Sequence, residues 1–299
     1  MKSYILLLFL ITLMSCNNSK TQFNIDAEYI LKFEDNLSER AENRINYLQL
    51  TGLFKLDSLD NTFGKDNINS FVLAITNLPS EIGSISVFED SLVFTASENI
   101  IIKNSNDSII TNNHLKLNEN GSSIKLFYKQ LNWQVITRSG QYYLRVWDTK
   151  NPAVEAFQGF ERFKLDPEFI YEGQFTYYDK VKTEEVHSQL GVNATTNFIG
   201  EVSFEYKGIS YNLDVGNSGF TMVSDKTTGD ETYGGGRYIY LDLPETDGLV
   251  TLDFNYLYNP PCAFSDFTTC LYPPRQNNLT FIILAGERID FIDSDLKNK

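Results

Sequence analysis

The chain has 299 residues, with 25 Lys and Arg against 39 Asp and Glu, a formal net charge of −14, two His and three Cys. Binding to nucleic-acid phosphates requires a basic face, so this balance argues against a nucleic-acid partner. Two histidines argue against a His-rich metal site or a histidine relay. A hydrophobic content of 42%, with 22 Phe and 17 Tyr, is ample for a buried core and excludes disorder over most of the length.

The first fifteen residues have the pattern of a signal peptide. One positive charge at Lys2 precedes an apolar run that is too short to remain as a membrane anchor. The run ends in Leu13-Met14-Ser15-Cys16, which resembles a bacterial lipobox, the signal after which the cysteine is acylated. We therefore expect residues 1–15 to be a lipoprotein signal peptide and residues 16–25 to be a tether that starts at a lipidated Cys16. The alternative is an ordinary secretory signal with an incidental cysteine.

This interpretation places the protein in the bacterial cell envelope, on its periplasmic or cell-surface side. The membrane would be its partner through the lipid anchor, because several acyl chains give durable attachment. No later segment reaches eighteen consecutive apolar residues, so no transmembrane helix is expected. The sequence does not indicate a protein partner.

The remaining cysteines, Cys262 and Cys270, are eight residues apart. Outside the cytoplasm such a pair is typical of a disulfide. Free thiols and a catalytic thiol are the alternatives, although neither His114 nor His187 is close in sequence. Two cysteines without a nearby histidine supply too few soft ligands for a metal.

Residues Asp26 to Leu48 have the strongest helical pattern. Apolar side chains recur at three- and four-residue steps between charged residues, and the set is Ile30, Phe33, Leu37, Ala41, Ile45 and Leu48. Asp26 is a suitable N-cap, because its carboxylate can accept backbone N–H groups of the first turn. The pattern predicts one amphipathic helix that lays this stripe on the core.

After this helix, the spacing of apolar residues changes from the helical period to the two-residue period of β-strands. Short runs rich in Val, Ile, Phe and Tyr are separated by Asn, Asp, Gly and Ser, and Ser84-Ile85-Ser86-Val87-Phe88 alternates like a half-buried strand. Asp90-Ser91 and Ser139-Gly140 are typical of hairpin turns. These runs predict a mainly β protein with two β lobes, sandwich or barrel-like, preceded by the helix.

The strand pattern is interrupted between Asp148 and Pro167, where proline and glycine accumulate. We place the boundary between the two lobes there. Residues 26–150 then hold the helix and the N-terminal β lobe, and residues 168–290 hold the C-terminal β lobe.

Residues 225–287 contain the most distinctive motifs. The segment contains a Gly-Arg strand start at Gly234–Arg237 and a Leu-Asp-Phe-Asn strand end at Leu252–Asn255. An Asn-Pro-Pro-Cys-Ala segment follows at Asn259–Ala263, and then a second cysteine, Cys270, before the pair Pro273-Pro274. Together they resemble the domain-of-unknown-function family 1684 of bacterial secreted proteins and lipoproteins. The likeness extends more loosely over residues 40–290. It implies a β-rich extracytoplasmic protein and brings no established activity.

Several polar residues of the same segment could form one site. Asp253 and Asn255 are two apart, so on a strand they point to one face and, if that face is interior, need polar partners. Arg237 is the expected partner of Asp253. One interpretation is a structural Arg–Asp bridge. The other is a ligand-binding pocket lined by Arg237, Asp253, Asn255, Tyr258, Asn259 and Arg275.

Paired prolines would stiffen the wall of such a pocket, and Tyr233, Tyr258 and Tyr272 would supply stacking faces. It would suit a sugar, a carboxylate or a small anion. The glycines 234–236 are not a phosphate-binding loop, since no Lys-Ser/Thr follows them, and we expect a tight turn or a bulge. The acidic residues at 225, 230 and 231 lack Ca²⁺-loop spacing and predict a solvated turn. No metal and no cofactor is expected.

These observations favour an envelope lipoprotein that binds a small molecule, a sugar or an anion, or serves as a scaffold. The alternative is an extracytoplasmic hydrolase with a site built from Asp253, Cys262 or His187. The state of the cysteines separates the two, because a disulfide would remove the nucleophilic thiol.

Overall fold

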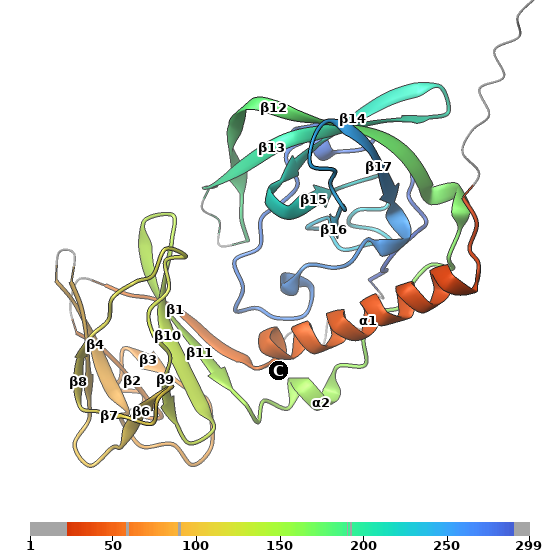
Figure 1. Ribbon diagram of the computed structural model, residues 1–299. Helices are drawn as coiled ribbons and strands as arrows, with labels where there is room; N and C mark the ends of the chain where they lie inside the picture. Colours follow the sequence, from red (N-terminus) through yellow and green to blue (C-terminus); the bar gives the residue numbers. More distant parts are fainter. Residues whose placement is uncertain (1–22, 58–59, 89–90, 190, 192, 290–299) are drawn as a thin grey trace, which may run out of the picture.

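The computed structural model describes residues 23–57, 60–88, 91–189, 191 and 193–289 (Figure 1). The predicted signal peptide and Cys16 lie outside these residues. Within them the chain is mainly β, with one long helix near the N-terminus, and none of the sheets closes on itself. The predicted fold class, mainly β and preceded by one helix, is confirmed. The described helices include none with the length and apolar composition of a bilayer span.

The first β region holds a six-stranded sheet of order β1-β11-β10-β9-β6-β7 and a five-stranded sheet of order β3-β2-β4-β5-β8. Their strands are β1 (Leu50–Lys55), β2 (Asp60–Gly64), β3 (Phe71–Val72), β4 (Gly83–Phe88), β5 (Ser91–Ala96), β6 (Ile102–Asn104), β7 (Ile109–Ile110), β8 (Asn112–His114), β9 (Leu126–Tyr128), β10 (Leu131–Arg138) and β11 (Gln141–Asp148). Trp133 stands in their shared apolar core, edge-on to Phe63. Alternation explains this placement, because every second residue of β10 faces the core.

The antiparallel pair β10–β11 turns at Ser139 and Gly140, whose φ angles are 47° and 72°. Two successive positive φ values are what a two-residue hairpin turn requires, and the predicted turn is therefore confirmed. The other predicted turn includes Asp90, which lies outside the described residues.

The C-terminal region holds a four-stranded antiparallel sheet of order β14-β13-β12-β17 and the two-stranded sheet β15-β16. The strands are β12 (Ile170–His187), β13 (Asn193–Tyr206), β14 (Ile209–Gly216), β15 (Phe220–Val223), β16 (Arg237–Tyr240) and β17 (Gly248–Asp253). Short helical segments lie around them: α2 (Ala153–Ala156), η1 (Pro167–Phe169), η2 (Asn217–Gly219), η3 (Phe254–Tyr256), η4 (Pro261–Ala263) and η5 (Arg275–Asn277). A second apolar cluster, around Phe175, Leu213 and Phe254, fills this region.

Helix α1 (Ala27–Leu48) begins as predicted, with the Asp26 carboxylate accepting the Tyr29 backbone N–H at 2.9 Å. Its buried side differs in part from the predicted stripe. Phe33 and Leu48 are buried, whereas Ile30 and Ile45 are 40% and 41% exposed. The helix is rotated because Arg44, a charged residue, is buried instead.

Arg44 is buried because it pairs with the carboxylate of Glu287. Its Nη2 lies 2.7 Å from both Glu287 oxygens, Arg162 Nη1 lies 3.0 Å from Oε1, and the Asn259 backbone N–H donates to Oε2 at 2.7 Å. A buried carboxylate is tolerated only when charge and hydrogen bonds satisfy it, and four donor contacts do so here. Glu287 thus joins α1 to the end of the C-terminal region.

The helix also contacts both β regions directly. Phe33 packs edge-on against Tyr256 at 5.0 Å between centroids, and Trp147 Nε1 of β11 donates to the Asn46 carbonyl at 2.9 Å. Figure 1 shows α1 lying along the C-terminal sheets and leading directly into β1. The sequence groups this helix with the first lobe, but its aromatic and ionic partners come from residues 157–287. Helix α1 is therefore the element that connects the two regions.

The Glu287 network generates the first prediction. Replacing Glu287 by Gln leaves two buried arginines without a countercharge, so the free energy of unfolding falls by about 3–5 kcal/mol. Urea denaturation of the variant measures the loss. The matched control is Glu28→Gln, which removes an exposed pair with Lys32 and leaves the midpoint unchanged. Equal midpoints for both variants would contradict the structural role assigned to Glu287.

Candidate functional site

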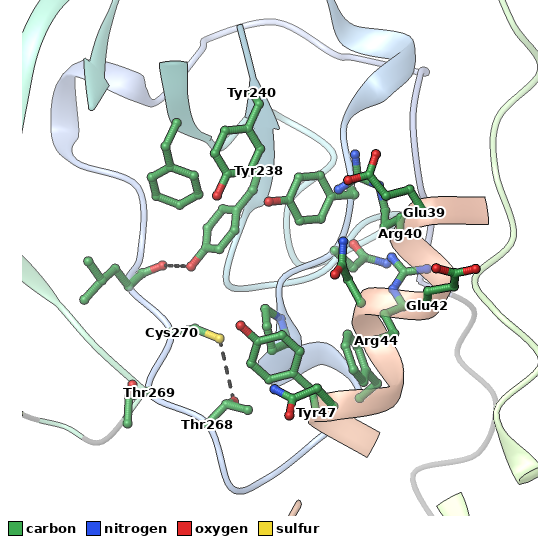
Figure 2. A pocket seen from close by; sticks show the side chains of 18 of the residues that line it. Glu39, Arg40, Glu42, Arg44, Tyr47, Tyr238, Tyr240, Thr268, Thr269 and Cys270 are labelled. Carbon is green, nitrogen blue, oxygen red and sulfur yellow. Dashed lines mark hydrogen bonds between the residues drawn. The ribbon is translucent and has the colours of Figure 1, made fainter. Parts of the chain in front are cut away.

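A cavity of about 920 Å³ lies where three parts of the chain meet. Helix α1 supplies one wall, β10 and β11 a second, and β16 with the segment 258–271 a third. Figure 2 shows Arg40 and Tyr47 of α1, Tyr238 and Tyr240 of β16, and Cys270 around it. Ligand pockets span about 300–1,000 Å³, so the cavity has room for an organic molecule.

The disulfide Cys262–Cys270 shapes the third wall. The bond is present as predicted, and the loop it closes supplies Phe264, Thr268 and Thr269 to the cavity lining. Tyr233 adds a further tie, because its hydroxyl donates to the Cys262 carbonyl at 3.2 Å. Cross-linking so short a loop limits the conformations that this wall can adopt. Neither sulfur remains a free thiol.

Four of the eight arginines in this acidic chain line the cavity, namely Arg40, Arg44, Arg138 and Arg145. Arg44 has its countercharge in Glu287. Arg40 lies 3.6 Å from the centroid of the Tyr258 ring, and burial lowers its pKa. Positive charges are therefore concentrated around this cavity, and of these four arginines only Arg44 pairs with Glu287.

Arg138 and Arg145 have no carboxylate partner among the described residues. Arg138 donates to the Thr137 carbonyl at 2.7 Å and to Thr269 Oγ1 at 3.4 Å. Burial and then the charge of Arg138 lower the pKa of Arg145 to about 10, and its buried Nε has no hydrogen-bond partner. Two partly buried like charges raise the free energy of the empty site, and a bound anion would lower it.

A third cation extends this cluster. Lys125 Nζ lies 4.5 Å from the centroid of the Trp147 ring, and its pKa is lowered by burial and by the nearby charge of Arg145. Because Arg145 pairs with Gln134 and Trp147 with Asn132 across β10 and β11, both side chains belong to one face of the sheet. Among the described residues, Lys125 and Arg145 on this face form no ion pair with a carboxylate.

The C-terminal wall of the cavity is aromatic. Tyr238 and Tyr258 meet edge-on at 5.9 Å, and Tyr240 lies parallel to Tyr258 at 6.4 Å. Burial raises the pKa of both Tyr238 and Tyr258, and the Tyr238 hydroxyl donates to the Leu271 carbonyl at 2.6 Å. Tyr240 is 57% exposed.

The structure brings only part of the predicted site to this cavity. Tyr258 and Asn259 line it. Arg237 is 1% exposed and pairs with Asp225, Nη2 to Oδ2 at 2.8 Å, so the predicted Arg237–Asp253 bridge is wrong. The contacts explain the difference, because Arg237 also donates to the Ile283 carbonyl, while the Asp253 carboxylate is bound by Tyr29 and Asn255. The predicted solvated acidic turn is likewise wrong at Asp225, whose carboxylate is buried.

Asp253 and Asn255 belong to the docking of α1. β17 ends at Asp253, and its carboxylate accepts the Asn255 backbone N–H at 2.9 Å and the Tyr29 hydroxyl at 2.8 Å. Burial raises the pKa of Asp253, and the hydrogen bond from Tyr29 partly offsets that effect. The Asn255 side chain is bound to the backbone of Asp166 on both sides. These two polar residues therefore have structural partners.

The other predicted residues lie apart from the cavity. Arg275 is exposed in η5. Tyr233 and Tyr272 pack beside the glycine turn, where both rings approach Gly235. The described residues contain no group of three or more His, Cys, Asp or Glu placed to hold a metal ion.

Sequence reasoning missed the cationic side of the cavity. Arg138 and Arg145 lie on strands of the first region, and Arg40 lies on a helix interpreted only as core packing. One sequence feature could have indicated Arg145: it is a charged residue inside the aromatic and apolar run Tyr142–Trp147, where a charge without a partner is costly.

The unpaired arginines generate a second prediction. Replacing Arg145 by Met removes a partly buried charge and keeps the side-chain volume, so the ligand-free protein gains about 1 kcal/mol of stability. Chemical denaturation without added anions measures the change. The control is Arg275→Met, which alters an exposed arginine and leaves stability unchanged. A loss of stability in Arg145→Met would show that the residue is a structural support.

Comparison with known proteins finds one similar solved structure and one family model. The solution NMR structure of the uncharacterized protein from gene locus rrnAC0354 of Haloarcula marismortui is 30% identical, over 46% of this chain and 80% of that chain, with a TM-score of 0.38. No curated protein matches. The model of the family described as Protein of unknown function (DUF1684) matches residues 155–288. Through these residues the chain belongs to the DUF1684 family.

Proposed function

We propose that this protein is an extracytoplasmic, lipid-anchored binding protein whose ligand is a small anionic molecule. The observation that carries the binding proposal is the pair Arg138 and Arg145, which lines a cavity of about 920 Å³ without a carboxylate partner among the described residues. In a chain of net charge −14, carboxylates to pair with these arginines are abundant, so their unpaired state is the property to be explained.

Arginine suits this role because its planar guanidinium binds carboxylate and phosphate oxygens with two parallel hydrogen bonds. Thr269 Oγ1 already contacts Arg138, and a hydroxyl beside the guanidinium can donate a further hydrogen bond to an anion. Arg138 and Arg145 are themselves partly buried, and partial burial strengthens the attraction between opposite charges.

The hydrolase alternative has less support. Cys262 is bonded to Cys270 and cannot act as a thiolate. Asp253 is bound by Tyr29 and Asn255 rather than directed at the cavity. A general base must reach the proton that it abstracts, and neither group lies among the residues that can meet a ligand there.

Anion binding tests the proposal through its two arginines. In the parent protein, glucuronate, inorganic phosphate or acetate at millimolar concentration raises the melting temperature. Arg138→Gln and Arg145→Gln each weaken binding about thirtyfold, corresponding to about 2 kcal/mol for one charged hydrogen bond. Calorimetric titration measures the affinities.

Arg275→Gln is the matched control, because it removes an exposed arginine outside the cavity and should leave the affinity unchanged. If all three variants bind equally, or if no anion alters the parent's melting, the binding proposal fails.

The anchor is proposed from Leu13-Met14-Ser15-Cys16, and the disulfide is consistent with an oxidising compartment. We expect mass spectrometry of the mature protein to find acyl chains on an N-terminal Cys16. Cys16→Ser should move the protein from the membrane fraction to the soluble fraction. A mature N-terminus elsewhere, with Cys16 unmodified, would contradict the anchor.

A further inference from the structure

We infer that the ligand of this cavity is an acidic saccharide, a sugar that carries a carboxylate, rather than a simple anion. This inference rests on the proposed function and narrows its substrate class. Its basis is the separation of charge, amide groups and aromatic surface among the three walls of the cavity.

The walls differ in the groups that they present to a ligand. β10 and β11 contribute Arg138 and Arg145 and no carboxylate, whereas α1 contributes Glu39, Glu42 and Asn43 beside Arg40 and the Glu287-paired Arg44. A ligand that is negative throughout would bring part of its charge beside the carboxylates of Glu39 and Glu42. A ligand with its negative charge at one end and hydroxyl groups at the other satisfies both walls, because carboxylates accept hydrogen bonds from hydroxyls.

The third wall presents an exposed aromatic ring. Tyr240 is the most exposed of its rings, at 57%, and it lies parallel to Tyr258 and 5.3 Å from Phe220 between centroids. These neighbours hold the ring in place, so little conformational entropy is lost when a ligand covers it. The apolar C–H face of a pyranose can lie on such a ring while its hydroxyls point sideways to polar partners.

Size supports the same conclusion. A cavity of about 920 Å³ greatly exceeds what one carboxylate or phosphate group fills, and a ligand bound only by the two arginines would leave the other walls without contacts. A sugar ring presents a hydroxyl on most of its carbons, which matches the side-chain amides and carboxylates along α1.

The experiment compares four ligands on the full chain with its disulfide intact: glucuronate, glucose, acetate and guanosine monophosphate. Calorimetric titration should find glucuronate at least tenfold tighter than acetate and glucose. Tyr240→Ala should weaken glucuronate binding about tenfold and acetate binding less than twofold, while Tyr240→Phe keeps the ring and the affinity. Phe88→Ala, an exposed aromatic residue on β4, is the control and changes neither affinity.

The outcomes separate this inference from the proposed function. Glucuronate and acetate of equal affinity, both lost in Arg145→Gln and both unaffected by Tyr240→Ala, would overturn the saccharide assignment and leave anion binding standing. A nucleoside monophosphate that binds more tightly than glucuronate would also overturn it. If none of the anions binds, the proposed function falls together with the inference.

Discussion

The arrangement of the molecule depends on one buried carboxylate. Glu287 receives Arg44 from α1, Arg162 from the segment before β12, and the backbone N–H of Asn259 from the cavity wall. Each donor comes from a different part of the chain, and a buried charge of this kind holds its partners because releasing any of them leaves a charge unsatisfied. Glu287 and Asn259 lie within the family's residues 155–288, whereas Arg44 does not. The family match therefore does not include α1, the helix whose Arg44 supplies a countercharge to the buried Glu287.

The same helix makes the cavity possible. Arg44 of α1 pairs with Glu287, and other residues of the same helix line the cavity. The hydrogen bond from Trp147 Nε1 to the Asn46 carbonyl joins β11 to the end of this helix. Two kinds of arginine result. Arg44 and Arg162 are paired with Glu287, whereas burial disfavours the charged forms of Arg138 and Arg145, which have no carboxylate partner among the described residues. Proteins retain such a cost mainly at sites where a ligand supplies the missing charge.

Local patterns in the sequence predicted local structure well. The helix with its Asp26 cap, the hairpin at Ser139-Gly140 and the disulfide depend on neighbouring residues, and all three are present. The site was harder to predict, because its partners are distant in the chain. Arg237 pairs with Asp225 rather than Asp253, and Tyr29 takes the place assigned to Arg237 beside Asp253. Hydrophobic periodicity could not show the burial of Arg44, since an ion pair decides it.

The most direct test of this account is a crystal structure of the protein grown with glucuronate. The account predicts that the carboxylate lies between the guanidinium groups of Arg138 and Arg145, with the sugar ring on Tyr240 and the Arg44–Glu287 pair unchanged. Glucuronate bound elsewhere on the surface, or an empty cavity in which either arginine pairs with a carboxylate of the protein, would contradict it.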